Sequence, residues 1–173
     1  MESASKDGLV IVNVGGTGSG KTYFTRMLLS VLKASGKRFY IHDIDGEYTD
    51  FYSSAFEPIK KFFNRVLKTL NSVIVFEEAV LVFKHFGQSD EILELLVGAR
   101  RRKNVIIFNF HSMRQVPVWI LTYCDRIVIR HTSFDSVERF EKDYPHIVEI
   151  YHNVQRSADR YFYEEINLRP EKT

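Results

Sequence analysis

The sequence has few of the features that stabilise secreted domains or anchor a chain in a bilayer. It contains one cysteine, Cys124, so no intrachain disulfide and no cysteine-based zinc site can form. Its apolar runs are about six residues long, whereas a membrane-spanning helix needs about 20. Residues 1–8 are polar and lack the apolar segment of a signal peptide. We therefore expect a soluble protein without a membrane partner, suited to the cytoplasm, with Cys124 as a small buried side chain.

Net charge is also low. The 24 Lys and Arg residues and 22 Asp and Glu residues leave a formal charge of +2, so nucleic-acid binding would have to rest on local clusters. With 173 residues, of which 45% are hydrophobic and 27% charged, the chain has the composition of a folded domain. We expect one domain over 9–168, with tails at 1–8 and 169–173.

Short runs rich in Val and Ile alternate with amphipathic segments. The predicted strands are 9–14, 38–44, 72–76, 104–110, 125–130 and 160–166, the last polar enough for a sheet edge. The predicted helices are 22–34, 58–70, 90–101 and 133–143, the last begun by Ser133 or Asp135. Strands that are apolar throughout indicate an α/β, three-layer fold with a mainly parallel sheet. In such folds ligands bind beyond the carboxyl ends of the strands.

A glycine-rich turn follows the first strand and matches G-x-x-x-x-G-K-[ST]. Its residues are Gly15, Gly16, Thr17, Gly18, Ser19, Gly20, Lys21 and Thr22. Glycines let successive backbone N–H groups point at phosphate oxygens, and the free N–H groups of the following helix add to the cradle. The lysine reaches the β- and γ-phosphates, and the threonine hydroxyl ligates Mg²⁺. The motif predicts a site for ATP and Mg²⁺.

Two carboxylates, Glu77 and Glu78, end the apolar run of the third strand. In phosphate-loop domains an acidic residue at this place holds the Mg²⁺ shell, so we assign Glu77 to the metal although Asp is commoner there. A second acid can deprotonate an attacking water, and we assign Glu78 as the general base. The structural alternative is a pair of solvated acids at a helix start, favoured by the helix dipole.

The segment 42–48 closes the second strand with acids followed by Gly46, Glu47 and Tyr48. This segment, and the order of phosphate loop, acidic pair and polar strand end, resembles the FtsK–HerA superfamily of DNA-pumping ATPases, which includes viral genome-packaging ATPases. The resemblance spans about 10–130. It implies a three-layer P-loop NTPase fold of the RecA/ASCE type.

The same resemblance implies two further roles. A polar sensor of the γ-phosphate belongs at the end of the fourth strand, and we carry it to His111 in preference to Asn109; the alternative is an ordinary loop histidine. An arginine that completes the neighbouring subunit's site precedes that strand, and we carry it to Arg101 or Arg102 rather than Arg100. The structural alternative is a basic helix end that complements the helix dipole.

The resemblance predicts ATP hydrolysis that drives translocation of double-stranded DNA by a ring of subunits, with a viral portal or procapsid as a further partner in the host cytoplasm. Basic side chains that would meet DNA phosphates, or form a solvated helix face, are Lys60, Lys61, Arg65 and Lys68. Nearby aromatic side chains that would stack on a base or, more simply, pack are Phe51, Tyr52 and Phe56. Two other activities stay open: a nucleotide or small-molecule kinase, which the acidic pair disfavours, and an ATPase for protein or filament assembly.

Overall fold

The computed structural model describes residues 8–51, 57–132 and 137–169 and contains a six-stranded sheet. The strands are β1 (Leu9–Val14), β2 (Arg38–His42), β3 (Ser72–Phe76), β4 (Val105–Phe110), β5 (Arg126–Arg130) and β6 (Tyr163–Asn167). Their order across the sheet is β2-β3-β4-β1-β5-β6. Every neighbouring pair is parallel except β5 and β6, so β6 is an antiparallel edge strand as expected. The phosphate loop follows β1, at the point where the chain order reverses between β4 and β5.

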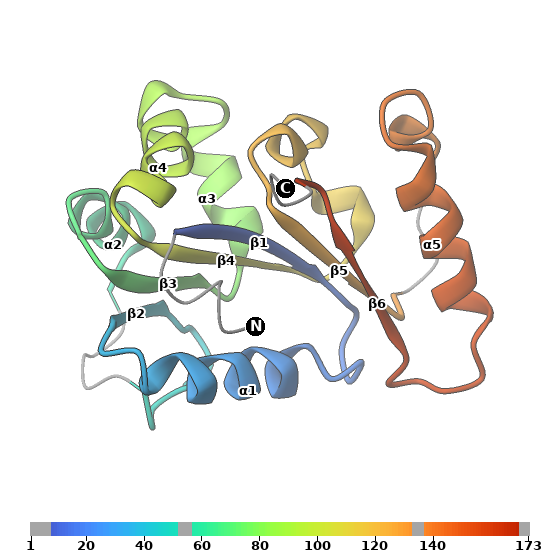
Figure 1. Cartoon of the computed structure of the whole chain (residues 1–173), viewed down its shortest axis with the longest axis horizontal. Coiled ribbons are helices and arrows are strands. Elements are labelled where there is room, and N and C mark those ends of the chain that lie inside the picture. Colours follow the sequence, from blue (N-terminus) through green and yellow to red (C-terminus); the bar gives the residue numbers. More distant parts are fainter. Residues whose placement is uncertain (1–7, 52–56, 133–136, 170–173) are drawn as a thin grey trace.

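Five α-helices lie on the two faces of this sheet (Figure 1). They are α1 (Lys21–Lys33), α2 (Ile59–Val66), α3 (Ala79–Phe86), α4 (Asp90–Arg101) and α5 (Pro145–Arg156). α1 lies alone on one face, and the other four cover the opposite face, which gives the predicted three layers. In the three described stretches of chain, no helix is long and apolar enough to cross a membrane.

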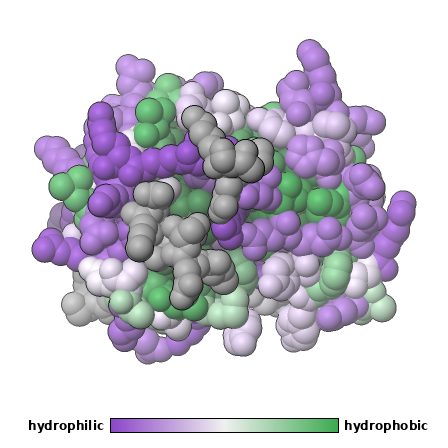
Figure 2. Space-filling view, viewed as in Figure 1, coloured by the Kyte–Doolittle hydropathy of each residue, from purple (hydrophilic) through white to green (hydrophobic). Residues whose placement is uncertain are grey.

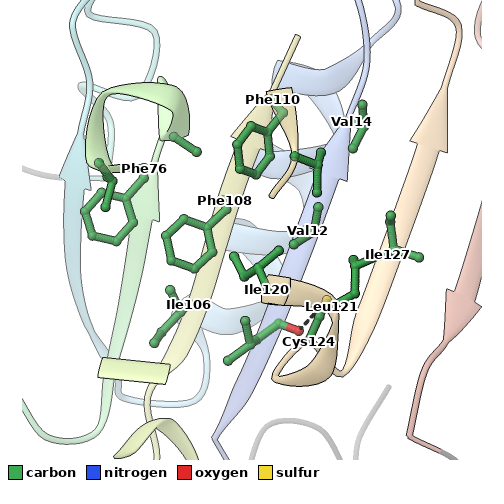
Figure 3. Packing of buried hydrophobic residues seen from close by; sticks show 14 of the residues in the cluster. Val12, Val14, Phe76, Ile106, Phe108, Phe110, Ile120, Leu121, Cys124 and Ile127 are labelled. Carbon is green, nitrogen blue, oxygen red and sulfur yellow. Dashed lines mark hydrogen bonds between the residues drawn. The ribbon is translucent and has the colours of Figure 1, made fainter. Parts of the chain in front are cut away.

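The inner strands are apolar throughout because their alternate residues pack into two hydrophobic clusters, one on each face of the sheet. Val10, Val12 and Val14 point into the cluster that α2, α3, α4 and α5 cover. Ile11 points the other way and packs with Phe24 and other residues of α1. Figure 3 shows the larger cluster, including Cys124, whose thiol is buried as expected. Burial raises the pKa of that thiol to about 12, so it is an inert packing group.

Three predicted elements, β2, α2 and β6, are at least two residues shorter than expected, and a side-chain hydrogen bond accounts for the ends of the first two. β2 stops at His42 because the Asp43 carboxylate accepts bonds from the backbone N–H groups of Gly46, Glu47 and Tyr48, which turns the chain. α2 stops at Val66 because the side chain and N–H of Thr69 both bond the Val66 carbonyl. Lys68 therefore lies beyond the helix, and its predicted place on the same helix as Lys60, Lys61 and Arg65 is wrong.

The prediction also missed one helix, α3, and placed another at 133–143, whereas the helix of that region is α5. α3 begins directly after Glu78, and its buried Ala79 and Val82 sit beneath β4. The predicted helix at 133–143 is wrong over its described part, which holds only a 3₁₀ turn at Glu138–Phe140. Its proposed caps, Ser133 and Asp135, lie outside the described residues. The helix of this region is α5, with a proline at its first position and a buried stripe at Ile147, Tyr151 and Val154.

The surface of the protein is mostly hydrophilic over the described residues. Hydrophilic residues dominate the face seen in Figure 2, and hydrophobic residues show between them in separate patches. On the side of α1, Phe51 packs on Phe39, with ring centroids 6.1 Å apart, so the packing alternative holds for this aromatic. Tyr52 and Phe56 lie outside the described residues.

The stacked rings of Phe76 and Phe108, 5.1 Å apart and within 6° of parallel, tie β3 to β4 beneath the acidic pair. Phe108→Ala removes a fully buried ring, so we expect the free energy of unfolding to fall by about 3–5 kcal/mol. Leu70→Ala is the matched control, since that side chain is 67% exposed. Denaturant titration measures both. Equal losses in the two variants would contradict this view of the core.

Candidate active site

The phosphate loop adopts the open conformation that an anion needs. Gly18 and Gly20 have positive φ angles of 74° and 84°, which side chains disfavour, so the loop curls ahead of α1. No side chain caps the first turn of α1, and its N–H groups are available to a ligand. The Ser19 hydroxyl is buried without a hydrogen-bond partner. An orphaned hydroxyl and uncapped N–H groups together form a cradle of donors suited to phosphate oxygens.

A buried ion pair joins this loop to the end of β3. The Lys21 ammonium lies 3.3 Å from Glu77 Oε1, and both residues are buried. The other oxygen of Glu77 accepts hydrogen bonds from the Tyr48 hydroxyl at 2.6 Å and from the Asn109 amide at 2.5 Å. Both oxygens of the carboxylate are therefore held, which offsets the cost of burying its charge.

The Tyr48 side chain is fully buried, so its hydroxyl does not exchange the Glu77 carboxylate for water. Burial, and then the charge of Glu77, raise the pKa of Tyr48 far above its usual value, so the hydroxyl stays protonated and donates. Asp43 places Tyr48 by accepting its backbone N–H at 2.8 Å. The Gly-Glu-Tyr segment thus serves to bring a phenol from the loop after β2 to the acid at the end of β3.

Glu78 occupies a different environment from Glu77. Its side chain is 26% exposed, and its Oε1 forms a hydrogen bond with Nε2 of His111, whose side chain is 38% exposed. The backbone N–H of His111 is in turn bonded at 3.0 Å by the side chain of Gln115. A carboxylate that is accessible to water and oriented by a partner fits the predicted general base better than the fully enclosed Glu77.

The two sensor candidates therefore contact different acids. Asn109 is fully buried, bonds Glu77, and accepts a hydrogen bond from Asn13 at 2.9 Å. His111 lies at the exposed tip of β4 and bonds Glu78. Asn109 is suited to holding Glu77 in place. The sensor role stays a prediction, and the contact with the accessible carboxylate favours His111.

Oxygen ligands for Mg²⁺ gather where α1 starts. The Thr22 hydroxyl donates to Glu47 at 3.0 Å, and Glu77 lies beside Lys21. Within 8–51, 57–132 and 137–169, no group of three or more His, Cys, Asp or Glu side chains is arranged to hold a metal ion. Mg²⁺ commonly takes one or two protein oxygens together with water and phosphate oxygens. The donors present fit that pattern, with a nucleotide supplying the remaining ligands.

Two arginines beside the phosphate loop were missed by the sequence analysis. Arg160 donates to the carbonyl of Thr17 at 3.1 Å from the turn before β6. Arg130, the last residue of β5, is buried and packs against Gly15. A charged residue that ends an otherwise apolar strand was a usable signal for Arg130. Arg160 had none, because its contact joins segments 143 residues apart.

The arginines predicted to act in a neighbouring subunit lie at the end of the sheet where the parallel strands begin, whereas the phosphate loop lies at the end where they finish. These arginines end α4 and precede the amino end of β4, roughly 20 Å of strand away from His111 at its carboxyl end. Arg102 is paired with Glu94 of α4, whereas Arg101 is exposed and makes no ion pair within the described parts of the chain. Arg100 pairs with Asp125. None of the three reaches the phosphate loop of its own subunit.

The basic residues expected to meet DNA are partly engaged within the chain. Arg65 pairs with Glu57 and lies over the ring of Tyr40. Lys60, Lys61 and Lys68 are exposed. Arg65 is exposed as well but is paired, so the three lysines are the exposed cations of this group for which no ion pair is found in the described residues.

The hydroxyl of Tyr48 gives a direct test of the Glu77 network. Tyr48→Phe removes one donor from a buried carboxylate, and a hydrogen bond to a charged group contributes about 1.5–3 kcal/mol. We expect the free energy of unfolding to fall by about that amount in a denaturant titration without nucleotide. Tyr123→Phe is the control, since Tyr123 is partly buried and its hydroxyl makes no hydrogen bond to any of the described residues. A similar loss in both variants would show that the Tyr48 hydroxyl does not stabilise Glu77.

Comparison with known proteins agrees with this geometry. The profile of the DNA-binding domain of type IV secretion-system coupling proteins, the TrwB type, matches residues 3–65. No curated protein shows significant similarity. The genome packaging NTPase B204 of Sulfolobus turreted icosahedral virus 2 in complex with ATP-gammaS superposes with a TM-score of 0.76 at 20% identity, over 97% of this chain and 95% of that one.

Two further solved structures give the same result. The same NTPase in complex with AMPPCP has a TM-score of 0.76 at 21% identity, over 95% of this chain and 93% of that one. The DNA-packaging ATPase B204 from Sulfolobus turreted icosahedral virus has a TM-score of 0.75 at 19% identity, over 94% and 93% of the two chains. At these identities the likeness is one of fold, and this chain shares the α/β fold of these packaging NTPases.

Proposed function

We propose that the chain is a Mg²⁺-dependent ATPase that drives translocation of double-stranded DNA, in the manner of a viral genome-packaging motor. The observation that carries the proposal is the arrangement at the carboxyl edge of the sheet. The uncapped phosphate loop, the Lys21–Glu77 pair and the accessible Glu78–His111 pair converge there. A phosphate cradle beside a positioned base is what hydrolysis of a terminal phosphate requires.

Each residue has a chemical part in this scheme. The N–H groups of the phosphate loop and Lys21 bind the triphosphate, and Glu78 takes the proton of the attacking water while the γ-phosphoryl group leaves ADP. His111 orients the Glu78 carboxylate and responds when the phosphate departs. Mg²⁺, held by Thr22 and the phosphates with Glu77 nearby, would neutralise charge on the phosphate oxygens. Glu77 offsets the charge of Lys21 until the nucleotide does so.

Support for DNA as the moved polymer comes from the relatives and from the surface. The matched profile belongs to a DNA-binding domain, and the B204 proteins are described as genome-packaging enzymes. Lys60, Lys61 and Lys68 are exposed cations that can neutralise DNA phosphates without reading sequence. A ring of subunits, and attachment to a viral portal or procapsid, belong to the same proposal.

Steady-state ATPase assays with linear double-stranded DNA test this function. We expect DNA to raise the rate several-fold in the presence of Mg²⁺. Glu78→Gln should keep ATP binding and lower turnover by about 10²–10⁴-fold, because a general base contributes about that factor. Glu141→Gln, at an exposed position, is the matched control and should leave turnover unchanged. Wild-type turnover in Glu78→Gln would remove Glu78 from the mechanism.

The DNA surface is tested in the same assay. Lys60→Ala with Lys61→Ala should reduce stimulation by DNA and its dependence on salt, while basal turnover stays the same. Lys33→Ala with Lys142→Ala is the matched control, because it removes the same charge from exposed sites elsewhere.

The two alternative activities would give other results. Phosphoryl transfer to a nucleoside, with no hydrolysis even when DNA is present, would contradict the motor and favour a kinase. Stimulation by a protein substrate alone would favour an assembly ATPase.

Mixing experiments test whether an arginine acts between subunits. If Arg101 or Arg102 completes a neighbour's site, each alanine variant alone is inactive, and mixing it with Glu78→Gln subunits restores part of the activity. We expect rescue with Arg101→Ala, since Arg102 is held by Glu94. Arg160→Ala is the matched control: its contact with the phosphate loop lies within one chain, so mixing should rescue nothing. Absence of rescue for Arg101→Ala and Arg102→Ala would exclude the trans role.

A further inference from the structure

An aromatic cavity of about 410 Å³ lies beside the phosphate loop and has no part in the hydrolytic scheme. Tyr23 and Met27 of α1 form one side, and Arg130 at the end of β5 forms the floor. Tyr161 and Tyr163, from the turn into β6, form the other side. Figure 1 shows why the two sides meet, since the turn before β6 returns to the end of the sheet at which α1 begins. The volume lies within the range of about 300–1,000 Å³ that small-molecule sites occupy.

The cavity presents aromatic and apolar surface to solvent. Tyr23 is 75% exposed, Tyr161 64%, Tyr163 41% and Met27 39%. None of these side chains belongs to either buried core cluster. Several exposed apolar side chains around one hollow commonly mark a binding site.

The floor and inner wall of the cavity are fixed. The Arg130 guanidinium lies 4.4 Å from the ring centroid of Tyr163 and 4.8 Å from that of Phe24. The rings of Phe24 and Tyr163 are 5.7 Å apart. Tyr163 is therefore held by an arginine and a buried ring, while Tyr23 and Tyr161 stand at the mouth.

The position of the cavity relative to Glu78 shows what would reach it. Glu78 and His111 follow β3 and β4, and the cavity lies beside β5 and β6, on the other side of β1 and the phosphate loop. A triphosphate whose terminal phosphate lies at Glu78 must extend its nucleoside in the opposite direction. The backbone there abuts the cavity, since a Cβ on Gly20 would lie 3.4 Å from the Tyr161 ring.

The lining also determines how a base would be recognised. Tyrosine rings offer flat faces for stacking, which tolerates any base because each has a π-face. Among the described residues, no side-chain amide or carboxylate lines the cavity. The one charged group there that could read a base edge, the Arg130 guanidinium, lies over the rings of Phe24 and Tyr163 instead. The tyrosine hydroxyls rotate and both donate and accept, so they distinguish adenine from guanine poorly.

We propose that this cavity binds the base of the nucleoside triphosphate by stacking, without discriminating adenine from guanine. The proposal rests on the function proposed above, since it assigns the base-binding part of the same site. Tyr23 and Tyr161 hold the base, and Tyr163 with Arg130 forms the wall behind it. The enzyme would accordingly accept GTP about as readily as ATP.

Calorimetric titration of the full chain in the Glu78→Gln background tests this inference, with ATP, GTP and inorganic tripolyphosphate as ligands in the presence of Mg²⁺. We expect the ATP and GTP dissociation constants to agree within about threefold, and tripolyphosphate to bind at least about tenfold more weakly, since stacking a base on an aromatic ring contributes on that order. Tyr23→Ala or Tyr161→Ala should weaken ATP and GTP about tenfold and leave tripolyphosphate unchanged. Tyr161→Phe should bind like the parent, because the ring remains.

The controls separate this inference from the proposed function. Leu70→Ala removes a similarly exposed apolar side chain far from the cavity and should change no affinity. If tripolyphosphate and ATP bind equally well, if Tyr161→Ala weakens both alike, or if ATP binds more than about 30-fold tighter than GTP, the base-stacking cavity is refuted while triphosphate binding stands. A change in oligomeric state with no change in ATP affinity would assign the cavity to a subunit contact instead. Failure of the parent to bind ATP and tripolyphosphate alike would refute both proposals.

Discussion

The buried ion pair between Lys21 and Glu77 is the contact on which the geometry of the site depends. A buried charge is costly unless it is paired and hydrogen-bonded, so Glu77 requires the donors that Tyr48 and Asn109 supply. These four residues come from the start of α1, the loop after β2, the end of β3 and the end of β4. One carboxylate therefore fixes the relative positions of four segments. A triphosphate that attracts Lys21 would change the balance of charge at the centre of that network.

Hydrogen bonds connect the two acids after β3 to the end of β4 and to the turn that follows it. Glu77 and Glu78 follow each other at the end of β3, yet they bond to Asn109 and His111 at the end of β4. His111 is also bonded by Gln115, in the 3₁₀ turn that leaves β4. In the proposed mechanism, a change in the charge opposite Glu78 would act through this hydrogen bond on the segment after β4. Because the contact is partly exposed, it can rearrange at lower cost than the enclosed Glu77 network.

Sequence analysis identified the parts of the site that lie in continuous motifs. The phosphate loop, the acidic pair and the polar end of β4 were found because local spacing and strand ends mark them. Tyr48 was noticed within a motif, but its role depends on the turn that Asp43 organises. Arg160 acquires its position from the packing of β6 as an edge strand, which no local pattern shows. Helix α5 is a different case. Its first-position proline and its apolar residues at helical spacing do predict a helix, but the prediction placed the helix in the preceding segment, 133–143.

The placement of Arg101 limits how subunits can complete one another's sites. This arginine lies at the amino edge of the sheet, whereas the phosphate loop lies at the carboxyl edge. An arginine that reached a neighbour's nucleotide would therefore bring unlike edges of two subunits together. Such a head-to-tail contact closes into a ring only if its rotation divides a full turn, and otherwise continues as a helix. An isologous dimer pairs residue i of one subunit with residue j of the other and j with i, so it would supply the arginine to both phosphate loops only if one surface patch spanned both ends of the sheet. If Arg101 acts between subunits as proposed, the distance between the two ends of the sheet favours a head-to-tail assembly such as a ring.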